Sequence, residues 1–222
     1  MEKIKIYQDD KSVHELSNAD PQMKKLIQII GDIEVVMRVD FFTSMVRSMI
    51  GQQISVQAAN AIYTRLESLM EYNITAVSIL NTPDERLRSI GLSARKVIYL
   101  RDLAEKVYDN EVDLQKLHAL DNQTVIKQLT SIKGIGKWTA EMFLIFSLGR
   151  MNVLAVDDIG IQRGAKWLYE VEKSERRKIL VDKQPVWSPH LTIASFYLWE
   201  TVHLDLVKKY NSIEDIGGQH YA

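Results

Sequence analysis

The segment LTSIKGIGKWTA, residues 129–140, places two glycines in a short turn between two stretches of helical periodicity. Gly134 and Gly136 permit positive φ and leave no side chain between the backbone and an approaching molecule. The amides after the turn open a helix, and such amides attract phosphate. Lys133 and Lys137 add positive charge beside them. The segment suits holding a nucleic-acid backbone without reading its sequence, although the pattern also fits a plain tight connection between two helices.

A second distinctive segment, VLAVDDIGIQRG at residues 153–164, follows about twenty residues later. Asp157 and Asp158 stand where a helix is predicted to open. An aspartate in this position is routinely an N-cap. Taken alone, the segment therefore predicts a helix start and no chemistry.

Helical periodicity extends outward from these segments in both directions and predicts about ten short helices. We expect one helix to begin near Asp20. Later helices are expected to be capped by polar side chains, namely Asp40, Ser55, Thr82 (before Pro83), Ser93 and Asp121. A charged helix is predicted over residues 171–183, and a last long one from Ser188-Pro189 through His203. Residues 1–18 are predicted to form a tail or a short extended segment.

Composition agrees with a helix-rich globular chain. Gly and Pro together make up 14 of 222 residues, fewer than a turn-rich all-β fold requires, and 46% of residues are hydrophobic. The absence of cysteine excludes disulfides, thiolate nucleophiles and Cys-ligated metal centres. The five histidines show no metal-binding spacing, so no metal and no cofactor are expected. The formal charge of −1 means that any basic surface must be local.

The glycine turn followed at this distance by Val-Asp-Asp-x-Gly-x-x-Arg resembles the helix-hairpin-helix base-excision DNA glycosylase superfamily, in particular its alkylation-repair branch, DNA-3-methyladenine glycosylase II. Residues 50–55 resemble the Gln-containing turn of that family, and residues 187–199 resemble its C-terminal helix. The likeness covers roughly residues 20–205. It implies an all-α, two-lobed fold with the active site in a cleft between the lobes. The core would span residues 19–222, with one lobe from the middle residues and the other from both chain ends.

The resemblance assigns Asp158 as the catalytic carboxylate. Cleavage of an N-glycosidic bond builds oxocarbenium charge on the sugar, and a fixed carboxylate stabilises that charge. The neighbouring Asp157 cannot share its face of the helix and is expected to be structural or solvent-facing. The alternative for Asp158 is the helix cap alone.

Three residues are candidates for the pocket of an extruded base. Trp138 stands where bifunctional relatives carry a Schiff-base lysine, so the resemblance implies a monofunctional enzyme that uses water as the nucleophile. Trp138 and Trp199 are the candidates for stacking, because aromatic faces attract a positively charged alkylated base. Met142, one turn after Trp138, would line the same pocket. For either tryptophan taken alone, a core aromatic is the better interpretation.

Contacts with DNA are expected from two turns. Gln53 is the candidate wedge that fills the gap left by the extruded base, while Gln52 is expected to brace its turn; both also fit ordinary polar loop residues. The residues expected to hold the backbone are Lys133, Gly134, Gly136, Lys137 and Thr139.

These observations predict a monofunctional hydrolase that excises alkylated purines, of the 3-methyladenine and 7-methylguanine class, from duplex DNA. The alternatives are a non-catalytic DNA-binding module and a glycosylase for another lesion such as uracil or hypoxanthine. The expected partner is double-stranded DNA containing alkylated bases, with no membrane association and a monomeric state. The expected location is the cytoplasm, at the nucleoid in a prokaryote, or the nucleus in a eukaryote.

Overall fold

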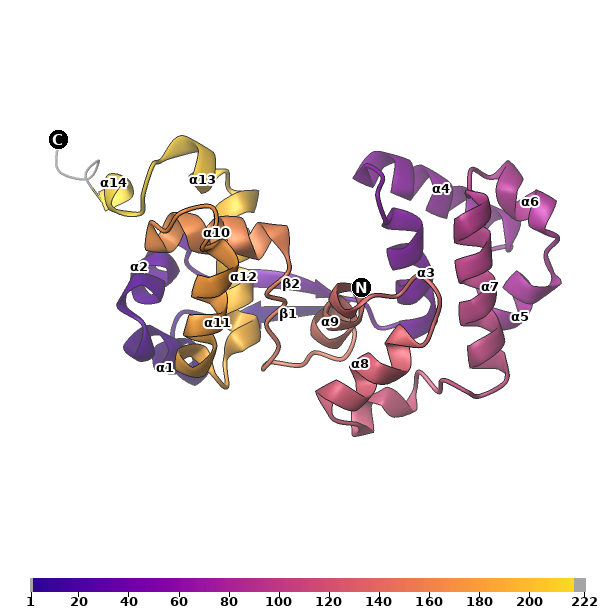
Figure 1. Ribbon diagram of the computed structural model, residues 1–222, viewed down its shortest axis with the longest axis horizontal. Coiled ribbons are helices and arrows are strands. Elements are labelled where there is room, and N and C mark those ends of the chain that lie inside the picture. Colours follow the sequence, from indigo (N-terminus) through magenta and orange to yellow (C-terminus); the bar gives the residue numbers. More distant parts are fainter. Residues whose placement is uncertain (1, 218–222) are drawn as a thin grey trace. The chain divides into compact units, whose positions relative to one another are not determined.

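The structure is a computed structural model that describes residues 2–217, and these residues are mostly helical (Figure 1). The described chain divides into two compact units. The first unit combines residues from both chain ends, 2–37 and 149–217, and the second is continuous over Arg38–Leu148. Apart from one small two-stranded sheet, the described residues carry the predicted all-α architecture. No described helix is long and apolar enough to cross a membrane.

The sheet belongs to the first unit and was not expected. Strand β1 (Glu2–Ile6) pairs antiparallel with β2 (Ile33–Met37), so that Ile6 lies opposite Ile33. Alternate residues of β2 are buried, and its intervening residues face solvent. The short extended segment predicted within residues 1–18 is present as β1, but the rest of that range differs from the prediction, because α1 (Lys11–Ala19) is a helix with Val13 and Leu16 fully buried.

Helix α12 (Leu191–His203) packs against four other helices of the first unit. These helices are α2 (Pro21–Ile30), α10 (Ile159–Tyr169), α11 (Arg176–Trp187) and α13 (Leu206–Lys209). The charged helix therefore begins and ends later than residues 171–183. The long helix is not the last one, because α13 and α14 (Glu214–Gly217) follow it.

The Asp20 side chain makes hydrogen bonds or ion pairs with three helices of the first unit. Its buried carboxylate caps α2 by accepting hydrogen bonds from the backbone amides of residues 22 and 23. It also accepts from the Tyr169 hydroxyl (2.7 Å) on α10, and from the Trp187 indole (3.0 Å) and the Lys183 ammonium (2.9 Å) on α11. Asp20 is therefore a structural hub, since every partner lies within the helical core of this unit.

The second unit consists of helices alone. In chain order these are α3 (Phe41–Gly51), α4 (Val56–Leu69), α5 (Ala76–Asn81), α6 (Asp84–Ser89), α7 (Ala94–Tyr108), the 3₁₀ helix η1 (Lys116–Ala119), α8 (Asn122–Thr130) and α9 (Lys137–Phe146). Helix α7 packs against α3, α5 and α6, while α9 packs against α3 and α8. Two turns join helices of this unit: the Gln turn (residues 52–55) between α3 and α4, and the glycine hairpin (residues 133–136) between α8 and α9.

The predicted helix caps of the second unit are confirmed with one exception. Asp40, Ser55, Ser93 and Asp121 each accept a hydrogen bond from a backbone amide in the first turn of their helix. Thr82 does not cap α6, because Pro83 occupies the N-cap position and the Thr82 hydroxyl donates back to the carbonyl of residue 78.

Candidate functional site

Asp158 is the N-cap of α10, and the residue is buried, with 8% of its surface exposed. Its Oδ1 accepts a hydrogen bond from the amide of Ile161 at 2.8 Å. The cap expected from the sequence is therefore present. Because burial of a carboxylate is costly without strong partners, the other contacts of Asp158 decide whether it is only a cap.

Trp199 on α12 supplies the second donor. Its indole Nε1 donates to the same Oδ1 of Asp158 at 2.9 Å, although the two residues are 41 positions apart in the sequence. Two donors from different elements fix the orientation of the carboxylate. The structure thus brings together two residues of the predicted site, the carboxylate and one of the two stacking tryptophans.

Two glycines of α10 allow this approach. A Cβ on Gly160 would lie 3.0 Å from the Trp199 ring and 3.1 Å from Oδ1 of Asp158. A Cβ on Gly164, one turn later, would lie 2.5 Å from the backbone oxygen of Leu198. The absence of side chains at these positions lets α10 pack closely on α12 and brings the indole against the carboxylate.

Buried polar side chains also brace the chain that leads to Asp158. Gln162 donates from Nε2 to the carbonyl of Val156 at 2.7 Å. Thr192 on α12 donates to the carbonyl of Arg150 at 2.6 Å and accepts from the amide of Val153 at 3.1 Å. These contacts hold the entry to α10 in place and extend the site beyond the residues predicted from the sequence.

Asp157, the adjacent acid, has a different environment. Its carboxylate is exposed and pairs with the guanidinium of Arg177 at 2.7 Å. This placement matches the structural or solvent-facing role expected for it. The two neighbouring aspartates are therefore distinguished by their partners as well as by their position.

The glycine hairpin lies in the second unit, between α8 and α9, and its two glycines differ. Gly134 has φ +83°, and a Cβ there would lie 2.2 Å from the Tyr99 ring. The expectation that Gly134 leaves room for a visiting molecule is thus corrected, because Tyr99 of the protein fills that side. Gly136 has open space around it and is the N-cap of α9, as expected for a backbone open to phosphate.

Both hairpin lysines carry acidic partners but remain exposed. The ammonium of Lys133 lies 3.1 Å from Asp102, and that of Lys137 lies 3.4 Å from Glu141. Burial alone raises the pKa of the Asp102 carboxyl, but hydrogen bonds from the Lys133 amide and from the ammonium groups of Lys133 and Lys106 lower it overall. The charge of the hairpin is therefore partly balanced within the protein.

The Gln turn contacts the glycine hairpin through Gln52. Its Nε2 donates to the carbonyl of Gly134 at 2.9 Å, so Gln52 braces more than its own turn. Gln53 is exposed and has φ +58°, an uncommon conformation for a residue other than glycine. The turn therefore presents the Gln53 side chain at the surface, as a wedge requires.

The remaining predicted residues lie on α9. Trp138 is 43% exposed and is not a core aromatic, whereas Met142 is buried one turn later. Thr139 is also buried, so its predicted contact with the DNA backbone has no support from its exposure. The stacking of Trp138 and Met142 on a base stays a prediction.

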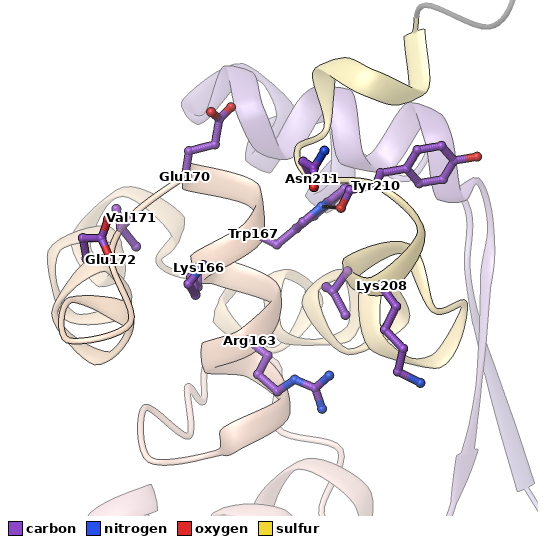
Figure 2. Close-up of a pocket in the computed structure, with 10 residues that line it drawn as sticks. Arg163, Lys166, Trp167, Glu170, Val171, Glu172, Lys208, Tyr210 and Asn211 are labelled. Atoms are coloured by element: carbon purple, nitrogen blue, oxygen red, sulfur yellow. Dashed lines mark hydrogen bonds between the residues drawn. The ribbon is translucent and has the colours of Figure 1, made fainter.

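A polar cavity of about 470 Å³ lies along α10 in the first unit (Figure 2). Arg163, Lys166 and Trp167 line the cavity from α10. Lys208 on α13 and Tyr210, the residue after that helix, line it from the other side. Neither Asp158 nor Trp199 is among its lining residues. This cavity is therefore not the predicted base pocket.

Comparison with known proteins places these features in a family. A family model described as HhH-GPD superfamily base excision DNA repair protein matches residues 46–189, which include the Gln turn, the glycine hairpin and Asp158. The chain belongs to this superfamily. It is 32% identical to DNA-3-methyladenine glycosylase 1 of Schizosaccharomyces pombe over 85% of this chain and 86% of that protein. It is 34% identical to a DNA-3-methyladenine glycosylase of Saccharomyces cerevisiae, covering 77% of this chain and 60% of that protein.

Solved structures of the same superfamily share the fold. A DNA-3-methyladenine glycosidase from Bacillus halodurans superimposes with a TM-score of 0.90 at 37% identity, covering 97% of this chain and 100% of that chain. A 3-methyladenine DNA glycosylase from S. pombe, solved in complex with abasic DNA, gives a TM-score of 0.79 at 32% identity and covers 87% and 97% of the two chains. The fold expected from the resemblance is thereby confirmed.

Several residues that support the Asp158–Trp199 pair in the first unit, or the glycine hairpin in the second, were not predicted from the sequence. Gly160 and Gly164 carry a detectable signal, since glycines four residues apart on a helix mark one face for close packing. Tyr99 and Asp102 carry no such signal. On an amphipathic helix, an aromatic residue is normally interpreted as core packing and an acidic residue as part of the solvated face.

Proposed function

We propose that this protein is a DNA glycosylase that hydrolyses the N-glycosidic bond of alkylated purines, of the 3-methyladenine and 7-methylguanine class, in duplex DNA. The observation that carries the proposal is the buried Asp158 carboxylate held by the Trp199 indole and the Ile161 amide. The names of the related enzymes support the same substrate class.

The proposed role of Asp158 is electrostatic. As the bond between C1′ and the base nitrogen breaks, positive charge develops on the deoxyribose. A carboxylate whose orientation is fixed in advance stabilises that charge without reorganising. Because Trp199 and Ile161 hold Oδ1 in place, the carboxylate is suited to this task.

The departing base requires little assistance from a general acid. Alkylation at N3 or N7 makes the purine cationic, so the base departs with the bonding electron pair and becomes neutral. Water adds its oxygen to C1′ and forms the C1′ hydroxyl, which keeps one of the two protons of the water, and the other proton passes to solvent. The reaction therefore requires charge stabilisation at the sugar more than it requires a general acid.

Recognition of the base is assigned to the tryptophans. Trp138 and Trp199 are the proposed stacking residues, since a cation over an indole face gains roughly 0.5–2 kcal/mol. The exposure of Trp138 supports this role, because a packed core aromatic would be covered. Such stacking favours a charged alkylated purine over a neutral normal one.

Trp138 also bears on the reaction type. It stands at the position where the family resemblance expects a lysine in bifunctional members, and an indole cannot form an imine with the sugar. We therefore propose a monofunctional enzyme whose product is an intact strand with an abasic site.

The test is to incubate the protein with duplex DNA methylated on its purines, at a stated salt concentration, and to identify the released bases by chromatography. The proposal predicts release of 3-methyladenine and 7-methylguanine, strand breakage only after alkali, and no borohydride-trapped adduct. Release of uracil or hypoxanthine alone, from DNA containing those bases, would reassign the lesion. Binding of DNA with no base release would indicate a binding module.

A further inference from the structure

We propose that helix α7 is a positioning element that holds the Gln turn and the glycine hairpin at a fixed spacing, with Gln52 as the direct link between them. The inference rests on the proposed function, because it concerns how base extrusion at one turn is coupled to backbone binding at the other. All the residues involved belong to the second unit.

Three side chains of α7, spaced three residues apart, reach the two turns. Lys96 donates from its ammonium to the carbonyl of Ile50 at 2.6 Å, next to the end of α3 where the Gln turn begins. Tyr99 packs its ring against Gly134. Asp102 accepts from the backbone amide of Lys133 at 2.8 Å. One rigid helix thus contacts the chain just before the Gln turn and both of the first two hairpin residues.

These contacts are made to the backbone within the hairpin and just before the Gln turn, so they fix where the turns lie. Asp102 is buried, and it also pairs with the ammonium groups of Lys106 (3.3 Å) and Lys133 (3.1 Å). Lys96 is partly buried, and burial lowers its pKa. Buried, hydrogen-bonded groups of this kind specify one arrangement, because leaving any of them unpaired is costly.

Gln52 joins the two turns directly. Its amide nitrogen donates to the carbonyl of Gly134, while the next residue is the exposed Gln53 with its positive φ. The conformation that projects Gln53 is therefore set against the hairpin. When hairpin amides hold a phosphate, this link places the wedge at a defined position along the same DNA.

The test measures single-turnover base release from two duplexes. One carries 7-methylguanine opposite cytosine, and the other carries it opposite an abasic site, where extrusion meets less resistance. Gln52→Glu keeps the size of the side chain but removes the donor to Gly134. We expect a loss of about tenfold on the paired duplex, the scale of one lost hydrogen bond, and less than about twofold on the other.

A double variant separates positioning from simple loss of structure. If Gln52 acts through the wedge, Gln52→Glu combined with Gln53→Ala is no slower on the paired duplex than Gln53→Ala alone. Equal losses on both duplexes, or multiplicative losses in the double variant, would overturn the proposal.

Asp102→Asn tests the contribution of α7, and Asp113→Asn is its matched control. Asp113 lies in the same unit, accepts from the amides of Gln115 and Lys116 and pairs with the Lys116 ammonium, so these contacts stay within residues 113–116. We expect Asp102→Asn to lose activity selectively on the paired duplex and Asp113→Asn to lose none. Equal behaviour of the two variants would contradict a positioning role for α7.

Failure of this inference is distinguishable from failure of the proposed function. If the wild-type protein releases no base from either duplex, the proposed function is wrong. The coupling is then tested by affinity, since Gln52→Glu is expected to weaken binding to the paired duplex more than to the duplex with an unpaired position. Equal weakening of binding to the two duplexes would overturn the proposed coupling.

Discussion

Two buried aspartates of the first unit cap helices, and their partners separate a structural role from the proposed catalytic one. Asp20 is surrounded by the Tyr169 hydroxyl, the Trp187 indole and the Lys183 ammonium, which use its carboxylate fully within the core. Asp158 is held by the Trp199 indole and the Ile161 amide, and a carboxylate fixed in this way is suited to stabilise a positive charge that develops beside it.

Asp20→Asn tests the structural role. Asparagine preserves the cap but leaves Lys183 without its buried partner, so we expect a loss of about 3–5 kcal/mol in the free energy of unfolding at neutral pH. Urea denaturation measures it. Asp40→Asn, an exposed cap, is the control and should change little.

The effect of Asp20→Asn should depend on pH with a definite sign. Burial alone raises the pKa of the Asp20 carboxyl, but hydrogen bonds from Lys183, Tyr169, Trp187 and the Met23 amide lower it overall. A depressed folded-state pKa adds stability above the unfolded value of about 3.9, and that stability disappears as pH falls through the folded value. The difference between wild type and variant should therefore shrink in acid. A constant difference from pH 7 to pH 2 would contradict this account of Asp20.

At the scale of elements, the packing of α10 on α12 positions the candidate site. Gly164 lies in contact with the backbone of Leu198, the residue before Trp199. Any side chain at residue 164 would push α12 away from α10. The hydrogen bond between Trp199 and Asp158 therefore depends on residue 164, which takes no part in that bond.

Gly164→Ala should reduce both stability and activity. A Cβ 2.5 Å from a backbone oxygen forces the helices apart, and overpacking of this kind costs about 1–3 kcal/mol. Gly51→Ala is the control, because Gly51 also lies in a helix but a Cβ there would meet only Ala59 at 3.9 Å. Thermal unfolding and base-release rates measure both variants. Equal melting temperatures for the two variants would show that the contact at Gly164 is not tight.

Local signals predicted most of the helices, whereas long-range contacts were not predictable. Caps such as Asp40 and Ser93 were found because the capping hydrogen bond spans three residues. Strand β2 was missed because its five residues follow a helical stretch, and its buried alternation acquires meaning only when β1 pairs with it. Trp199 and Asp158 were each selected through the family resemblance. Their hydrogen bond depends on the α10–α12 crossing, which no local pattern specifies.

At the scale of the whole molecule, a net charge of −1 gives little general attraction to DNA. We therefore expect binding to depend on local groups, such as the exposed lysines and the helix-opening amides at the glycine hairpin. Such contacts release counterions one by one, so the salt dependence of binding counts them.

Lys133→Ala should lower the slope of log affinity against log salt by about one. Its backbone amide still donates to Asp102, and Lys106 still pairs with that acid, so the hairpin should persist. Lys173→Ala removes an exposed lysine outside the predicted site and should leave the slope unchanged. Fluorescence anisotropy over a range of salt concentrations gives both slopes. An unchanged slope for Lys133→Ala would remove this lysine from the DNA-contacting set.

The most direct test of the proposed chemistry compares Asp158→Asn with Asp157→Asn in single-turnover release of 7-methylguanine from duplex DNA. Asparagine keeps the cap and an oxygen for the Trp199 indole but removes the negative charge. We predict that Asp158→Asn binds DNA normally and loses at least about 100-fold in rate, while Asp157→Asn, whose acid is exposed and paired with Arg177, stays close to wild type. Undiminished base release by Asp158→Asn would contradict the assignment of this carboxylate.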